Sequence, residues 1–261
     1  MSRVSCITST LTKQQTEYIF AGTQELPFGN YPLFDPTSHC QGCDRIRLNA
    51  GDTKTISDID FLVVIPSAPE NHALRQRIRS TWGSAPSRFH RKQLYFFIGL
   101  THDQELQKKI FKENTSWKDV IQPDFYDDFR NLTLKSLSIL YWVHFRLADE
   151  RFRPKFIFKC DDDNLVDIFQ LEDYLETLDM YDDEIVCAVR EEAVPSRKEN
   201  ERKFIDAKTW NEPLYPRCCF GSAYFIAPSA ISELIIAHES EKLPFVPYED
   251  VYITGTSHLK F

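Results

Sequence analysis

The sequence predicts an α/β protein in which a mostly parallel central sheet is flanked by helices. Short apolar runs, at residues 61–65, 94–98 and 156–158, are typical of strands that are buried on both faces. Helical segments with a periodic apolar face alternate with these runs, which is the strand–helix–strand pattern of a parallel sheet. Three consecutive aspartates follow the third run directly, at the end of a strand where ligands bind in open α/β sheets.

Each element has its own justification. In the helix predicted over residues 71–82, Leu74 and Ile78 stand four apart and share one face. In the helix predicted over residues 131–151, apolar residues recur at spacings of three and four, and Pro154 ends it. The full order is a strand at 61–65, a helix at 71–82, a strand at 94–98, a helix at 103–111, a strand at 119–122, a helix at 131–151, a strand at 156–158, a helix at 169–178, strands at 185–189 and 224–226, and a helix at 229–238.

The chain divides at about residue 58. Residues 1–58 are polar, are broken by glycines and prolines and lack sustained periodicity, so we expect a stem-like, loosely structured extension. Residues 59–261 carry the strand and helix patterns and form the predicted globular domain.

Composition excludes several classes of function. The 261 residues carry 31 basic and 39 acidic side chains, and the net charge of −8 argues against nucleic acid as a partner. No apolar run approaches the 18 or so residues of a membrane span, and residues 1–20 lack the apolar stretch of a signal peptide. We therefore expect neither a membrane span nor a signal peptide within this chain. The seven cysteines are an odd number, which leaves at least one unpaired and the compartment undecided.

The aspartate triplet is the first candidate for chemistry. In an extended chain Asp161 and Asp163 point to the same side, about 6.6 Å apart, so both can bind one divalent cation. Carboxylate oxygens suit Mg²⁺ or Mn²⁺, and such an ion keeps positions open for phosphate oxygens. The alternative is a solvated acidic turn, but the buried strand just before the triplet favours a site.

Two further pairs are candidates. Glu249 and Asp250 lie between apolar neighbours, where partial desolvation raises the pKa of a carboxylate toward that of a general base. The alternative for this pair is helix capping at a surface turn. Arg75 and Arg79 share a helical face and present two guanidinium forks to a diphosphate or an acidic loop, or they form an ordinary solvated face.

Five segments, taken in order, resemble the β-1,3-galactosyltransferase family (glycosyltransferase family 31), which includes N-acetylglucosaminyltransferases and, more distantly, the Fringe proteins. The segments are Arg75 to Gly83, Phe96 to Gly99, Asp124 to Lys135, Lys159 to Asp163 and Pro247 to Tyr252. Within them, Arg77 replaces the usual alanine and Phe129 the usual tyrosine. Each segment alone is a weak signal, whereas five in register are specific.

The resemblance implies a GT-A fold and an inverting transfer of galactose or N-acetylhexosamine from a UDP-sugar to a glycan hydroxyl in β-1,3 linkage. It implies Mn²⁺ held by Asp161 and Asp163, with Asp250 as the base and with Glu249 either supporting Asp250 or contacting the acceptor. The donor contacts that it implies come from Arg75, Arg79, Lys135, Asp161 and Asp162. It also implies an acceptor on a glycoprotein or glycolipid, and a Golgi membrane protein.

Departures from the family pattern leave alternatives open. Eleven residues follow Asp250, fewer than in family members, so we expect a domain shortened at its C-terminal end. His258 lies too close to Asp250 to replace the metal-binding histidine of the family. A shortened domain that binds a nucleotide sugar or glycan without turnover is therefore one alternative. An aspartyl phosphatase of the haloacid dehalogenase type is another, although Asn164-Leu165 does not match its usual motif.

Overall fold

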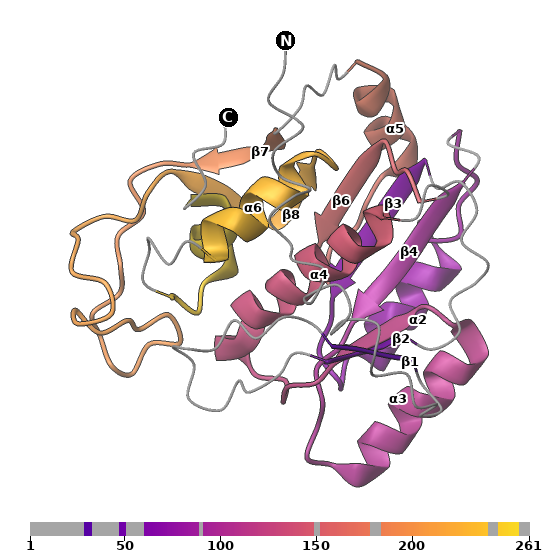
Figure 1. The fold of residues 1–261 in the computed structure, drawn as a ribbon, viewed down its shortest axis with the longest axis horizontal. Coiled ribbons are helices and arrows are strands. Elements are labelled where there is room, and N and C mark those ends of the chain that lie inside the picture. Colours follow the sequence, from indigo (N-terminus) through magenta and orange to yellow (C-terminus); the bar gives the residue numbers. More distant parts are fainter. Residues whose placement is uncertain are drawn as a thin grey trace.

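An eight-stranded mixed sheet forms the centre of the protein (Figure 1). The computed structural model describes residues 29–32, 47–50, 60–88, 91–148, 152–177, 184–239 and 245–255. Along the sheet the strands follow the order β1-β2-β5-β4-β3-β6-β8-β7. Their bounds are Gly29–Pro32 (β1), Arg47–Ala50 (β2), Phe61–Pro66 (β3), Lys92–Phe97 (β4), Val120–Pro123 (β5), Phe156–Cys160 (β6), Ile185–Arg190 (β7) and Cys218–Ile226 (β8).

The four central strands, β5, β4, β3 and β6, are parallel, as predicted. All six residues of β3 are buried, because helices cover both faces of the sheet at this point. The outer strands pair antiparallel: β8 with β6, β7 with β8, and β2 with β5 and β1.

The helices form two layers (Figure 1). Alternate residues of β3 point to opposite faces, so Leu62 and Val64 pack with α4 and α6, while Val63 and Ile65 pack with α2, α3 and α5. The helix bounds are His72–Ser80 (α2), Gln104–Trp117 (α3), Leu132–Leu147 (α4), Ile168–Thr177 (α5) and Ala230–Glu239 (α6), with a short 3₁₀ turn at Phe129–Asn131 (η2) and a π-helical turn at Asp250–Thr254 (η3).

This topology creates one functional edge. The carboxyl ends of β3, β4 and β6 lie side by side, and β8 returns antiparallel along β6 with Ala223 opposite Cys160. Residues that follow β6 and residues that precede Ala223 therefore meet at this carboxyl edge. The π-helical turn η3 packs against β8 and α4, which brings the end of the described chain to the same place.

Most predicted elements are confirmed, with three differences. The helix predicted to end at residue 111 extends to Trp117, and the strand predicted at 224–226 is the end of a nine-residue strand. Two short strands, β1 and β2, occur within residues 1–58, where we predicted none. The rest of that segment, and the helix end predicted at 149–151, lie outside the described residues. Within the described parts of the chain, no helix is both long and apolar enough to cross a bilayer.

Candidate functional site

The aspartate triplet lies at the carboxyl edge, immediately after β6. The backbone N–H of Asp161 donates to the carbonyl of Ser222 at 2.9 Å, and the Asn164 side chain donates to the same carbonyl at 2.6 Å. The start of β8 thus holds the turn that carries the triplet.

The three aspartates point in different directions. The Asp162 carboxylate accepts hydrogen bonds from Ser67 Oγ at 2.6 Å and from Asn71 Nδ2 at 2.9 Å, so it connects the turn to the end of β3. Asp161 is partly exposed, and Asp163 is exposed and forms no side-chain hydrogen bond with a described residue. The triplet forms a turn and not the extended segment that we expected: Asp162 binds Ser67 and Asn71, Asp161 binds Lys159, and Asp163 faces solvent.

Lys159 joins the triplet to the later acidic pair. Its ammonium group lies 2.9 Å from Asp161 Oδ1 and 2.8 Å from Glu249 Oε1, and it also donates to the Gly221 carbonyl. Burial by itself lowers the pKa of Lys159, but the charges of Glu249 and Asp161 outweigh burial and raise it. Two motifs about 90 residues apart therefore share one buried cation.

Glu249 is almost completely buried. Besides Lys159, it accepts hydrogen bonds from the Tyr224 hydroxyl at 3.0 Å and from Ser136 Oγ at 3.3 Å. Burial raises the pKa of Glu249, and the nearby ammonium of Lys159 only partly opposes this shift. Gly221 makes the close packing possible, because a Cβ at this position would come within 2.8 Å of Glu249 Oε1.

Asp250 begins the π-helical turn beside Glu249. Its Oδ2 lies 2.8 Å from the Arg190 guanidinium at the end of β7, and its Oδ1 accepts the backbone N–H of Val251 at 2.9 Å. The carboxylate is 17% exposed, so it is oriented by the protein yet remains open to solvent. Each of its oxygens keeps a second lone pair for a proton.

A groove of about 630 Å³ begins at this edge and runs between α5 and strands β7 and β8. Asn164 and Ser222 line its end nearest the triplet, and Tyr174 and Gln170 of α5 line its outer wall. A half-exposed tyrosine ring beside amide and hydroxyl groups suits a partly polar, ring-shaped ligand.

The donor set at the edge is consistent with a divalent metal shared with a phosphate ligand. Within the described residues, no group of three or more His, Cys, Asp or Glu side chains is placed to hold a metal ion. Mg²⁺ and Mn²⁺, however, are commonly bound by one or two carboxylates together with substrate phosphates. Asp161, whose Oδ2 accepts no hydrogen bond from a described residue, and the exposed Asp163 are the two carboxylates at this edge that could bind such an ion.

The structure corrects our expectation for Arg75 and Arg79. They share a helical face, but both guanidinium groups pair with Glu113 of α3, at 2.8 and 2.7 Å. Arg75 is fully buried, and Arg79 also pairs with Asp119 at the amino end of β5, away from the triplet. Buried charges require such partners, so neither fork is free to meet a diphosphate. Arg75 instead holds the end of β3, because it donates to Ser67 Oγ and to the Ala68 carbonyl.

Lys135, predicted as a donor contact, is buried as well. Its ammonium lies 2.7 Å from Asp127 Oδ2 and donates to the Ser67 carbonyl at 2.8 Å. Asp127 in turn accepts the backbone N–H of Gly99 at 2.7 Å. Lys135 therefore ties the carboxyl ends of β3 and β4 together, which is a positioning role in place of the predicted direct contact.

The sequence analysis assigned no role to Lys159, Arg190 or Tyr224. The position of Lys159 within the apolar strand Phe156–Cys160 could have predicted its role, because a buried ammonium needs acidic partners. Arg190 at the end of β7 and Tyr224 in β8 carry no such signal, since their importance depends on side-chain hydrogen bonds to Asp250 and Glu249, which lie 60 and 25 residues further along the chain.

A disulfide lies next to this edge. Cys187 of β7 and Cys219 of β8 are bonded across the sheet, while Cys160 and Cys218 are buried free thiols. The pair fastens β7, and with it Arg190, to the strand that carries Gly221.

Comparison with known proteins gives one consistent result. Residues 73–261 match a family model described as galactosyltransferase. The chain is 31% identical over 223 residues to mouse N-acetyllactosaminide β-1,3-N-acetylglucosaminyltransferase 4, a match that covers 85% of this chain and 61% of the relative. It is 28% identical over 225 residues to human lactosylceramide 1,3-N-acetyl-β-D-glucosaminyltransferase, a match that covers 76% of this chain and 58% of that relative.

A third relative is the rat UDP-GlcNAc:βGal β-1,3-N-acetylglucosaminyltransferase 7, 30% identical over 209 residues, with 77% of this chain and 51% of that protein covered. The chain thus spans between about half and three fifths of the length of these relatives. Mouse xyloside xylosyltransferase 1 aligns at 15% identity over 76% of this chain and 80% of that one, with a TM-score of 0.27, too low to inform the fold.

Proposed function

The chain belongs to the galactosyltransferase family, and from this premise we propose that it is an inverting glycosyltransferase that moves a hexose or N-acetylhexosamine from a UDP-sugar to a glycan hydroxyl. Because the chain belongs to this family, the alternative of an aspartyl phosphatase of the haloacid dehalogenase type is set aside. The names of the relatives favour N-acetylglucosamine as the sugar and a terminal galactose as the acceptor, in β-1,3 linkage.

One observation carries the proposal. Lys159 lies within hydrogen-bonding distance of both Asp161 and Glu249, so the acidic triplet and the later acidic pair occupy one edge of the sheet. An inverting transfer needs the two acidic groups close together. The triplet would hold the metal that neutralises the leaving diphosphate, and the later pair would accept the proton of the acceptor hydroxyl. A GT-A type of nucleotide-sugar domain is supported by this placement of acidic groups at the carboxyl ends of parallel strands.

In the proposed reaction, the oxygen of the acceptor hydroxyl forms a bond to the anomeric carbon of the donor sugar. The bond from that carbon to the β-phosphate oxygen breaks, and its electron pair leaves with UDP. Asp250 takes the proton from the hydroxyl, while Arg190 and the Val251 N–H keep its carboxylate in one orientation. Glu249, buried against Lys159, holds the backbone from which Asp250 projects.

Asp161 and Asp163 are the residues that would hold Mn²⁺, whose positive charge stabilises the diphosphate as it leaves. Asp162 orients this pair through Ser67 and Asn71. Lys159 keeps the Asp161 carboxylate at the edge.

We further propose that the protein works in the lumen of the Golgi, on glycoproteins or glycolipids. The Cys187–Cys219 disulfide supports a secretory compartment, because disulfides persist where the environment is oxidising. The names of the relatives include a glycan acceptor, N-acetyllactosaminide, and a glycolipid acceptor, lactosylceramide.

A transfer assay on two variants tests the proposal. With UDP-N-acetylglucosamine or UDP-galactose and a lactose acceptor, Asp250→Asn is expected to lower turnover by about 10²–10⁴-fold, the usual contribution of a general base. UDP affinity, measured by calorimetry, is expected to stay within about twofold. Asp173→Asn is the matched control, because Asp173 is exposed on α5 and, among the described residues, forms an ion pair with Arg88 alone.

The outcomes separate the alternatives. Turnover of Asp250→Asn equal to that of the control variant contradicts the role of Asp250. Binding of UDP by the unmodified chain without any product supports a binding module that does not catalyse transfer. Absence of both binding and transfer contradicts the proposed function.

A further inference from the structure

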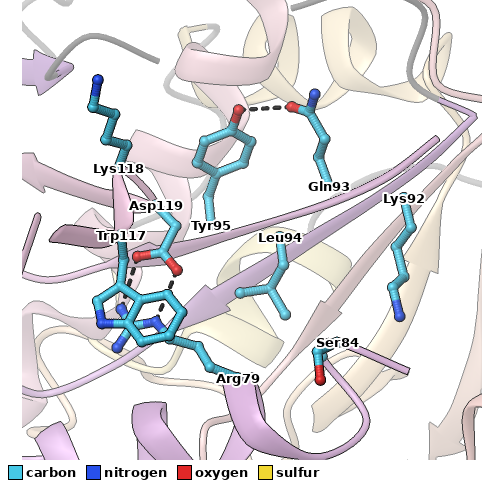
Figure 2. Close-up of a pocket in the computed structure, with 10 residues that line it drawn as sticks. Arg79, Ser84, Lys92, Gln93, Leu94, Tyr95, Trp117, Lys118 and Asp119 are labelled. Atoms are coloured by element: carbon cyan, nitrogen blue, oxygen red, sulfur yellow. Dashed lines mark hydrogen bonds and ion pairs between the residues drawn. The ribbon is translucent and has the colours of Figure 1, made fainter. Parts of the chain in front are cut away.

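A second pocket, of about 350 Å³, lies at the opposite edge of the sheet from the acidic residues (Figure 2). It is lined by the first residues of β4, which include Lys92 and Leu94, by Arg79 and Ser84 at and beyond the end of α2, and by Trp117 at the end of α3. Because β4 runs parallel to β3 and β3 parallel to β6, the start of β4 and the triplet after β6 mark opposite edges. The pocket is therefore separate from the proposed reaction centre.

Trp117 gives the pocket an exposed aromatic wall. Its exposed fraction is 45%, whereas the other three tryptophans of the chain are at most 6% exposed. The Arg79 guanidinium lies 5.2 Å from the Trp117 ring centre on one side and 4.7 Å from the Phe96 ring centre on the other. Arg79 donates hydrogen bonds to Glu113 and Asp119, so the indole of Trp117 packs against a guanidinium group whose position is fixed. A ring that is already positioned binds a flat ligand face with little loss of conformational entropy.

The rest of the lining combines apolar, neutral polar and positively charged side chains with a single carboxylate, that of Asp119. Figure 2 shows Leu94 beside Trp117, with Ser84 and the Lys92 side chain on the far side of Leu94. Both oxygens of Asp119 already accept hydrogen bonds from Arg79, so this carboxylate offers no open charge. Lys92 donates to the Trp82 and Ala85 carbonyls and forms no ion pair with a described residue.

Burial lowers the pKa of Lys92, and the charge of Glu172 raises it only in part. An anion near this ammonium would thus replace solvation that burial has removed. Lys118, at the rim, adds a second positive charge with no ion-pair partner in the described parts of the chain. In a chain of net charge −8, this pocket contains one ammonium group, that of Lys92, which forms no ion pair with a described residue, while the Lys118 side chain extends away from Leu94 and Lys92 (Figure 2).

We propose that this pocket binds a negatively charged sugar residue, as a second glycan site separate from the reaction centre. The C–H face of a pyranose ring packs on the indole of Trp117 and on Leu94, and the acidic substituent lies near Lys92. A carboxylated sugar and a sulfated sugar both present this chemistry. The site takes part of a glycan chain as a ligand and carries out no reaction on it.

Tryptophan fluorescence provides the test, because Trp117 is the accessible one of the four tryptophans. Sialyllactose and sulfated lactose are titrated into the full chain, with lactose as the neutral probe and UDP as the nucleotide probe, and quenching of the indole by acrylamide is measured. Both acidic probes are expected to protect Trp117, with an affinity at least tenfold higher than that of lactose. This preference is expected to shrink as salt is raised.

Variants assign the signal to the pocket. Because Trp117→Ala removes the fluorescent reporter, its binding is measured by calorimetry, where it is expected to lose affinity for both acidic probes; Lys92→Gln is expected to reduce the affinity for acidic probes to the level of lactose. Phe111→Ala, another half-exposed aromatic of α3, is the matched control and is expected to bind normally. Asp250→Asn is also expected to retain binding, which separates this site from the reaction centre.

Three results would overturn the proposal. One is unchanged quenching at 10 mM of either acidic probe. Another is wild-type affinity of Trp117→Ala for the acidic probes in calorimetry, when thermal unfolding shows that the variant is folded. The third is equal affinity for UDP and for the acidic sugars, which would assign the pocket to nucleotides.

Discussion

The cluster of Arg75, Arg79, Glu113 and Asp119, here the helix cluster, and the cluster of Lys159, Asp161 and Glu249, here the edge cluster, both place charge inside the protein. In the helix cluster every carboxylate oxygen accepts hydrogen bonds from an arginine. In the edge cluster Asp161 is 38% exposed and keeps one oxygen without a described donor. The helix cluster is complete without a ligand, whereas the edge cluster is not.

This difference shows how structural and functional charge are told apart. The two arginines of the helix cluster and the three residues of the edge cluster all lie in segments that resemble family motifs. A buried ion pair that satisfies itself contributes specificity to the fold and offers nothing to a ligand. A cluster at a strand end in which part of a carboxylate remains exposed to solvent can still bind a ligand.

Substitution of Lys159 is expected to have the largest effect. In Lys159→Met, Glu249 loses its ion pair while it remains buried, which costs about 3–5 kcal/mol of unfolding free energy. We also expect transfer to fall by at least 100-fold, because Asp161 and the turn that carries Asp250 both lose their shared partner. Urea unfolding and the transfer assay measure the two effects.

Lys155→Met is the control, since this lysine lies just before the same strand but is exposed. It is expected to change stability by no more than about 0.5 kcal/mol. If Lys159→Met were as stable and as active as this control, the edge cluster would not organise the site.

Substitution in the helix cluster is expected to affect stability alone. Glu113→Gln leaves the buried guanidinium of Arg75 without a carboxylate partner, so we expect a loss of about 3–5 kcal/mol. The variant that remains folded is expected to bind UDP with normal affinity. Glu105→Gln, whose ion pair with Lys108 is exposed, serves as the control in the same helix. A folded Glu113→Gln that binds UDP more than tenfold more weakly would contradict the separation of the two clusters.

The helix cluster is also expected to make the stability of the protein depend on pH, an effect smaller than those of the substitutions above. Burial would raise the pKa of Glu113, but hydrogen bonds and charges from Arg75 and Arg79 outweigh it and hold the pKa below 4.5. A depressed pKa adds stability that is present above pH 4.5 and is lost as the pH falls through the lowered value. The urea midpoint of the wild type is therefore expected to fall more steeply below pH 4.5 than that of Glu113→Gln. If the urea midpoints of the two proteins fell in parallel as the pH was lowered, the ionisation of Glu113 would not contribute to stability.

The order of strands and helices from β3 to α6 follows from apolar runs and periodicity, and the sequence predicted it well. The end of α3 was missed because Asn114, Thr115 and Ser116 are weak helix formers, while the buried contacts of Glu113 with α2 stabilise the added turn. The full length of β8 was missed because Cys218 to Ala223 carry no strand pattern until they pair with β6 and β7.

The candidate site was predictable in part. The position of Asp161 to Asp163 after a buried strand indicated a ligand edge. The meeting of this edge with Glu249 depends on packing across 90 residues, which no local pattern contains. Spacing alone placed Arg75 and Arg79 on one face but did not reveal that Glu113 lies opposite that face.

The central claim, that Asp161 and Asp163 hold a metal which binds the donor diphosphate, is tested most directly by UDP binding with and without Mn²⁺. Calorimetry on the wild type is expected to show UDP affinity at least tenfold higher in Mn²⁺ than in EDTA. In Asp163→Ala this difference is expected to disappear, while unfolding stability stays unchanged because the side chain is exposed. Equal Mn²⁺-dependent binding by Asp163→Ala and the wild type would contradict the claim.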